Sequence, residues 1–120
     1  MTTTALILRE PPSANRWWRN VNGRMVLSRA AREYKQHVAN EAFVRRVRPI
    51  RKPEPVAVSI IWYRQRRVGD LDKRVGILLD ALIGHCYTDD SQVTSLFAQR
   101  VDAAERRGEV EVMVTRIKDS

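Results

Sequence analysis

The sequence predicts a single α/β domain of the α+β type, in which a mixed β-sheet carries two main helices. Apolar residues recur at helical spacing in segments 29–47 and 72–83, and this pattern predicts the helices. At 120 residues the chain is long enough for one hydrophobic core but not for two, so we expect one domain over residues 1–120. Segments rich in alternating β-branched and aromatic residues predict the main strands, at 2–9, 56–64, 93–101 and 109–117.

The first strand should end at Pro11-Pro12, because proline cannot donate to a strand ladder. Residues 13–24 then form a basic, aromatic loop, in which Asn22-Gly23 predicts the turn of a small hairpin. Trp17 and Trp18 stand between arginines in this loop. Either they stack on unpaired bases, or they pack into the core or a subunit interface. The sequence leaves both interpretations open for each tryptophan.

The first helix has a good N-cap in Ser28, and Pro49 should stop it. One face carries small and apolar residues and should be buried. The opposite face is basic, and either it is only solvated or it contacts phosphates. The cations of this face are Arg29, Arg32, Lys35, Arg45 and Arg46.

The strand at 56–64 is apolar on both faces, so we expect a central strand that is covered on both sides. The helix that follows should end at Gly84 as its C′ residue. Charged residues and Gly108 should form the turn between the last two strands, over 102–108. The buried stripe of the second helix comprises Leu71, Val75, Leu78, Leu79 and Leu82.

The composition points to a nucleic-acid partner. Twenty-two Lys and Arg against 14 Asp and Glu give a net charge of +8, which favours nucleic acid, or less often an anionic membrane. No apolar run approaches the length of a membrane span, and the N-terminus lacks the basic region of a signal peptide. Cys86 is the only cysteine, so no internal disulfide can form. We therefore expect a cytoplasmic protein without a membrane partner.

Carboxylates inside a basic neighbourhood are the sharpest chemical signal. Asp70 and Asp72 lie between Arg64, Arg66 and Arg67 on one side and Lys73 and Arg74 on the other, and Asp89-Asp90 follows later. Clustered carboxylates repel each other unless a cation lies between them. Mg²⁺ takes oxygen ligands and is often held by one or two carboxylates together with substrate phosphates. The pattern therefore predicts a metal-dependent nuclease whose arginines hold phosphates.

Helix geometry limits which carboxylates can share a metal. Two residues apart on a helix, side chains point about 200° from each other. Asp70 and Asp72 can therefore act together only if Asp70 is extended and Asp72 lies in the first helical turn. Asp80 lies about 12 Å further along the helix axis, so we expect it to have a structural or supporting role. The alternative for Asp70 or Asp72 is simple helix capping. His85 and Cys86 do not make a zinc site and should be structural.

Four motifs in this order resemble the RusA Holliday junction resolvases. They are Pro11-Pro12-Ser13-x-Asn15-Arg16, Gly69-Asp70-Leu71-Asp72, Asp80-Ala81-Leu82 and Asp89-Asp90-Ser91-Gln92-Val93, and together they span almost the whole chain. The resemblance implies a small homodimeric endonuclease of bacteria, phages or prophages that needs Mg²⁺ or Mn²⁺. It also implies a role in DNA recombination and repair, in which four-way junctions are resolved by paired, symmetric nicks.

The resemblance also assigns residues. It implies that Asp70, Asp72 and Asp90 are catalytic and hold the metal. The family usually has a lysine four residues after the second aspartate, where this chain has Gly76. We expect Lys73, one helical turn earlier, to supply that cation; the alternative is that Lys73 is merely solvated and Gly76 reflects drift or close packing. The residues expected to contact DNA are Asn15, Arg16, Arg19, Arg64, Arg66, Arg67, Lys73 and Arg74.

Two other functions remain open from the sequence. A catalytically weak or silent protein could bind junctions or other DNA through shape and charge alone, and Gly76 in place of lysine favours it. A basic scaffold that docks another protein has no specific support.

Overall fold

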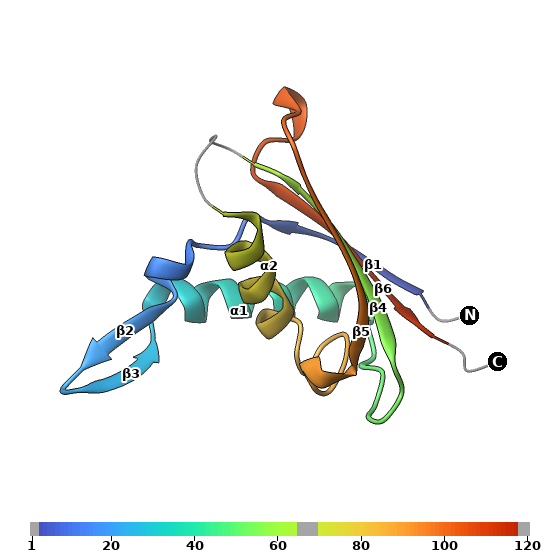
Figure 1. Cartoon of the computed structure of the whole chain (residues 1–120), viewed down its shortest axis with the longest axis horizontal. Coiled ribbons are helices and arrows are strands. Elements are labelled where there is room, and N and C mark those ends of the chain that lie inside the picture. The colour runs from blue at the N-terminus through green and yellow to red at the C-terminus, as the bar shows by residue number, and fades with distance from the viewer. Residues whose placement is uncertain (1–2, 65–69, 118–120) are drawn as a thin grey trace.

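The computed structural model describes residues 3–64 and 70–117. Both helices lie on one side of the sheet (Figure 1), and the predicted fold class, a mixed sheet with two helices, is confirmed. The elements are β1 (Thr3–Arg9), β2 (Trp18–Val21), β3 (Arg24–Leu27), α1 (Arg29–Val44), β4 (Val56–Tyr63), α2 (Leu71–Ala81), β5 (Val93–Val101) and β6 (Glu109–Arg116).

The main sheet has the strand order β1-β6-β4-β5. β6 pairs antiparallel with both β1 and β4, whereas β4 and β5 run parallel to each other. Parallel neighbours need a crossover connection, and α2 supplies it, so β4, α2 and β5 form a β-α-β unit. In such a unit the helix begins at the carboxyl end of the first strand, and the second strand begins at the opposite end of the sheet.

The core lies between the sheet and the helices. Val56, Val58, Ile60 and Trp62 of β4 are buried, whereas the alternate residues of this strand are only partly buried. The prediction that this strand is covered on both sides is wrong for the outward face, whose side chains are only partly buried. Its outward side chains are shielded partly by the flanking strands β6 and β5, which explains why both faces could be apolar.

The helix boundaries differ slightly from those predicted. α1 ends at Val44 rather than residue 47, because Arg46 adopts a positive φ of 55° and the Val47 N–H donates back to the Ala42 carbonyl. α2 has its C-cap at Leu82, so Gly84 lies one residue beyond the expected C′ position. None of the helices described here is long and apolar enough to cross a membrane.

The predicted hairpin is present as β2 and β3 (Figure 1), a separate two-stranded ribbon. Asn22 and Gly23 both have positive φ, as the tight turn requires. The two tryptophans have different environments. Trp17 is 2% exposed and packs edge-to-face with Tyr34 of α1, whereas Trp18 is 51% exposed. The core interpretation therefore holds for Trp17, and base stacking stays open for Trp18.

Candidate functional site

The start of α2 presents two exposed carboxylates, those of Asp70 and Asp72. Asp70 is the N-cap with extended backbone angles (φ −92°, ψ 132°), and Asp72 lies in the first turn, as the geometry required. Asp70 makes no side-chain capping hydrogen bond, which argues against the capping explanation for this residue. Its nearest described cation is the Lys73 ammonium, 3.5 Å away in an exposed pair. Exposed ion pairs contribute little to stability, so the pair with Lys73 leaves Asp70 able to bind a metal cation, as is Asp72.

Arg74 anchors this end of α2 to the sheet instead of facing solvent. Its guanidinium lies 5.1 Å from the centroid of the Trp62 ring and donates to the Pro11 carbonyl. It also lies near the carboxylate of Glu10, which accepts a hydrogen bond from the Trp62 indole N–H. The Arg74 side chain is mostly buried by these contacts. These contacts hold Arg74 within the protein, and its predicted phosphate contact stays a prediction.

Arg64 is engaged in a similar way. Its guanidinium donates to both carboxylate oxygens of Asp102, at 2.7 and 3.2 Å, and this pairing raises the pKa of the arginine. A bidentate pair fixes the geometry of the arginine and neutralises its charge, so the predicted phosphate contact is not supported. Arg66 and Arg67, also predicted to contact DNA, lie outside the described residues.

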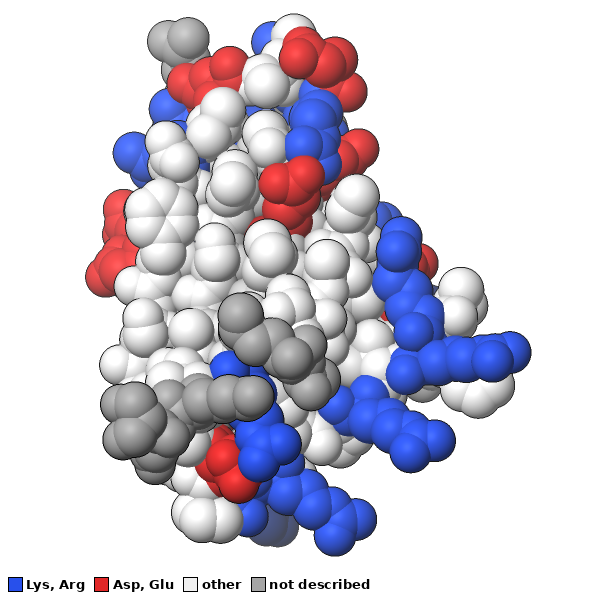
Figure 2. Space-filling model, turned by 90° about the vertical axis from the view of Figure 1, so that its right-hand side faces the viewer, with Lys and Arg blue, Asp and Glu red and all other residues white. Residues whose placement is uncertain are grey.

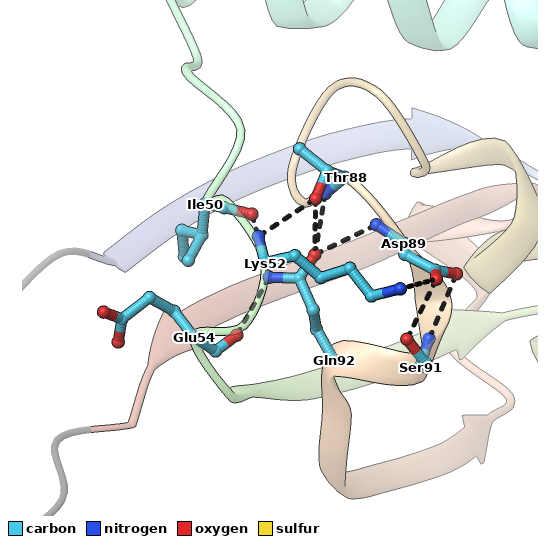
Figure 3. Close-up of polar contacts among 7 residues, drawn as sticks. All are labelled: Ile50, Lys52, Glu54, Thr88, Asp89, Ser91 and Gln92. Atoms are coloured by element: carbon cyan, nitrogen blue, oxygen red, sulfur yellow. Dashed lines mark hydrogen bonds and ion pairs between the residues drawn. The ribbon is translucent and has the colours of Figure 1, made fainter.

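The Asp-Asp pair lies in a turn that is held by Gln92 (Figure 3). The Gln92 side chain is buried, and its amide nitrogen donates to the carbonyls of Ile50 and Glu54. Its oxygen accepts from the backbone N–H groups of Thr88 and Asp89, each at 2.9 Å. The turn is thereby tied to the segment that leads into β4. Sequence reasoning missed this anchor, although Asp89-x-x-Gln92 matches the capping-box pattern.

The two aspartates of this pair have different roles. Asp89 accepts from Ser91 and forms an ion pair with Lys52 at 2.9 Å (Figure 3). The Lys52 and Ser91 hydrogen bonds hold the pKa of Asp89 well below its ordinary value. Asp90 is exposed and has no side-chain hydrogen bond or ion pair with any described residue. Asp89 is therefore structural, and Asp90 is the free carboxylate of the pair.

The structure does not bring Asp90 to Asp70 and Asp72 within one chain. Asp90 precedes β5, whose first residue pairs with Val56 at the start of β4. Asp70 starts α2 one turn before Arg74, and the Arg74 guanidinium lies over Trp62 near the end of β4. The 11 residues of α2 separate the two places by about 16 Å. Among the residues that the structure describes, no three His, Cys, Asp or Glu side chains are grouped so that they could hold a metal ion.

The remaining residues of α2 have defined surroundings. Asp80 forms an ion pair with Lys35 of α1 at 3.4 Å, which agrees with a structural role. Gly76 is exposed, and a Cβ built there would meet nothing within 4 Å, so close packing does not explain this glycine. Lys73 lies one turn before it on the exposed face.

His85 and Cys86 lie in the connection after α2. Burial raises the pKa of the Cys86 thiol to about 12, and burial together with Lys35 lowers the pKa of His85. A thiol with this pKa is inert at neutral pH. Both residues therefore fit the structural role that the sequence suggested.

The basic loop before the hairpin leaves its polar side chains accessible. Asn15 and Arg16 are exposed in a short 3₁₀ helix, Ala14–Arg16, and Arg19 is exposed on β2. Arg16 and Arg74 also line an open pocket between the end of β1 and the start of α1. This basic loop therefore lies near the start of α2, on the helix side of the sheet (Figure 1).

Free carboxylates beside cations, on a small and strongly basic domain, are typical of enzymes that act on phosphate polyanions. A family model described as Endodeoxyribonuclease RusA matches residues 9–115 of the chain. The chain therefore belongs to the RusA family, whose class is that of endodeoxyribonucleases. A search of curated proteins found no significant match.

Proposed function

We propose that this protein is a Mg²⁺-dependent endonuclease that resolves four-way DNA junctions by paired, symmetric nicks during recombination and repair. The family match over residues 9–115 carries this proposal. Asp72 and Asp90 have no side-chain hydrogen bond or ion pair with any described residue, and Asp70 has only an exposed ion pair with Lys73. This supports the proposal, because hard divalent cations prefer accessible carboxylate oxygens. Mn²⁺ should substitute for Mg²⁺.

Carboxylate oxygens suit a hard divalent cation. Asp70, Asp72 and Asp90 are the residues that would hold it, although the described residues of a single chain do not bring Asp90 to the other two. When bound, the metal supplies a water of lowered pKa and neutralises charge on the scissile phosphate. Lys73 is the nearest described cation to Asp70, and its flexible side chain can turn from that carboxylate to a phosphate oxygen. The open surface above Gly76 leaves space for this movement.

We assign DNA contact to residues that the fold leaves exposed, namely Asn15, Arg16, Arg19 and Lys73, with Trp18 as a surface on which an unpaired base can stack. Arg64 and Arg74 are left out because their guanidinium groups are already bonded within the protein. Binding should weaken steeply with salt, because each neutralised phosphate releases counterions.

A catalytically weak or silent DNA-binding protein is the second candidate. It is favoured by Gly76, which leaves the exposed face of α2 without the lysine usual at this position. A nuclease and a silent binder both bind junctions, so only cleavage separates them.

The test incubates purified protein with an end-labelled four-way junction, with and without Mg²⁺. The proposal expects metal-dependent nicks at symmetric positions on opposing strands. Binding without any nick, in either Mg²⁺ or Mn²⁺, would favour the silent binder.

A further inference from the structure

Four arginines gather at the end of α1 without acidic partners. They are Arg45, the C-cap of the helix, and Arg46, Arg48 and Arg51 in the segment that follows. All four are exposed, and none of their side chains forms a hydrogen bond or an ion pair with a described residue. Several other cations of this protein do pair with carboxylates, namely Arg29, Lys35, Lys52, Arg64, Arg106 and Arg116. We call the four residues without such partners the arginine cap.

The arginine cap surrounds two open hollows. Arg45, Arg46 and Arg48 line one hollow of about 440 Å³ beside the start of β1. Arg48 and Arg51 line a second hollow of about 360 Å³, so Arg48 lies between the two. Figure 2 views the molecule from the side toward which α1 ends, and Lys and Arg side chains gather in the lower right of this view. The four arginines therefore belong to one continuous basic surface.

The backbone that carries Arg48 and Arg51 is held in place. Ile50 lies between them and is buried, and its N–H donates to the Cys86 carbonyl. Its carbonyl accepts from the buried side chain of Gln92 in the turn before β5. Cations on a fixed backbone lose less freedom when they bind an anion. The arginine cap is thus a preorganised surface with a defined position relative to that turn.

Helix electrostatics explains only part of the arginine cap. A helix C-terminus carries partial negative charge, which accounts for cations at Arg45 and Arg46. The effect falls off within one turn, so it does not account for Arg48 and Arg51. Arg46 also has a left-handed φ of 55°, directly after the helix, where glycine is favoured. An arginine at this position is unfavourable for the backbone, which indicates that its side chain serves another purpose.

Exposed apolar side chains adjoin the arginine cap. Phe43 and Val44, in the last turn of α1, are 84% and 74% exposed. An aromatic ring beside cations is typical of surfaces that bind DNA, where guanidinium groups hold phosphates and the ring lies against a sugar or a base. The chain belongs to a family of endodeoxyribonucleases, so DNA is the polyanion that fits this surface.

We propose that the arginine cap is a second DNA-binding surface, which holds backbone phosphates of a junction arm. This inference rests on the proposed function. The basic loop that carries Arg16 and Arg19 is tied to the start of α1, because the N-cap Ser28 donates to the Arg16 carbonyl. The 16 residues of α1 place the arginine cap about 24 Å from this loop. DNA that contacts both surfaces must extend about seven base pairs, at about 3.4 Å each.

The first experiment removes three charges of the arginine cap together. The variant Arg45→Gln/Arg48→Gln/Arg51→Gln should bind a four-way junction about tenfold or more weakly at about 0.1 M salt. The slope of log K against log salt should fall by about 3, because three phosphates keep their counterions. Gel-shift titrations at several salt concentrations measure both quantities. Wild-type affinity and slope in this variant would overturn the inference.

A charge-matched control separates the arginine cap from net charge. The variant Arg29→Gln/Lys35→Gln/Arg107→Gln also loses three positive charges, at residues outside the arginine cap. It should bind the junction within about twofold of the wild-type protein, with an unchanged salt slope. Equal losses in the two triple variants would show that net charge alone governs binding, and would refute the arginine cap as a site.

A single substitution separates binding from folding. Arg46→Gly places glycine at the left-handed position and should raise the urea midpoint of unfolding. The same variant should bind the junction more weakly, because it loses one phosphate contact. A more stable protein with wild-type junction binding would overturn the assignment of Arg46 to the arginine cap.

The second experiment maps the contact directly. Arg48→Cys and Arg19→Cys each accept a thiol-linked photocrosslinker, while Cys86 is buried and stays unlabelled. The two variants should attach to a junction at positions about seven base pairs apart. Crosslinks from position 19 without any from position 48 would refute the inference.

The outcomes distinguish this inference from the proposed function. If the wild-type protein nicks junctions and the variant of the arginine cap binds them normally, the inference fails and the nuclease proposal stands. If that variant binds weakly but the wild-type protein never nicks, the arginine cap stands and the nuclease proposal fails. If the variant loses only binding to a glutamate-rich peptide, the surface serves an acidic protein partner and the DNA inference is refuted.

Discussion

Two acidic turns of this protein look alike in sequence and differ in chemistry. Each segment contains two aspartates, and in the structure each has a lysine beside it: Lys73 belongs to the Asp70–Lys73 segment, whereas Lys52 reaches the Asp89–Gln92 turn from a distant part of the chain. At the first, Asp70 makes no capping bond and only a weak, exposed ion pair. At the second, Asp89 is held by Lys52, by Ser91 and by the turn that Gln92 builds. A carboxylate is available for metal binding only where the local fold leaves its oxygens without partners.

The largest expected effect is on nicking, and it should distinguish the free aspartates Asp72 and Asp90 from Asp89, which is bonded within the protein. Asp72→Asn and Asp90→Asn should each reduce nicking of a four-way junction by about a hundredfold or more. Asp89→Asn should retain most of the activity. Junction binding by the first two variants should be equal or tighter, because each loses a negative charge that repels phosphates. Single-turnover cleavage and gel-shift assays measure both properties. Loss of nicking in Asp89→Asn alone would reverse the assignment.

Gln92→Ala should cause the largest loss of stability among these changes. The substitution leaves buried backbone carbonyls of Ile50 and Glu54 and the N–H groups of Thr88 and Asp89 without this partner. A cost of about 3 kcal/mol is expected, which urea unfolding measures. The exposed Gln36, whose side chain bonds to Asn40, provides the matched control, and Gln36→Ala should cost less than about 1 kcal/mol. Equal losses would contradict the anchoring role.

Lys73→Ala should slow cleavage about tenfold at saturating protein, with little change in binding. Adding Gly76→Lys should restore much of the rate, because the surface at 76 is open to a longer side chain. Arg29→Ala, which removes an exposed cation paired with Glu33 on α1, is the control and should cut normally. An unchanged rate in Lys73→Ala would exclude a catalytic role for this lysine.

The smallest expected effect is a change in folding stability at acidic pH. The pKa of Asp89 is depressed in the folded protein by hydrogen bonds from Lys52 and Ser91. Its contribution to stability is therefore fully present above the ordinary value of 3.8 and is lost as the pH falls through the lower folded value. Wild-type protein should lose more stability than Asp89→Asn as the pH falls below about 4. Urea titrations at several pH values test this, and parallel curves would show that the ion pair contributes nothing.

Much of the secondary structure was readable from local signals. Apolar periodicity placed both helices, and the strand predicted at 93–101 has the observed bounds of β5. Asn22-Gly23 identified the hairpin, and the structure meets the condition under which Asp70 and Asp72 can act together, an extended Asp70 before a helical Asp72. Short-range preferences of the backbone decide these features, so a window of a few residues contains the information. The end of α1 was predicted three residues too late, because the positive φ of Arg46 has no sequence signal as strong as glycine.

Contacts between distant segments decided the rest. Arg64 and Arg74 looked like phosphate ligands beside the aspartates, but Asp102 and Trp62 engage them from other strands or turns. Asp89 is also engaged by a distant segment, because its ion-pair partner is Lys52. The sequence alone determined which residues carry acidic and basic groups and which local structure each one joins. Only the tertiary structure decided which carboxylates stay free. It also decided that a β-α-β crossover places them at opposite ends of the sheet, because strand order depends on pairing between segments far apart in the chain.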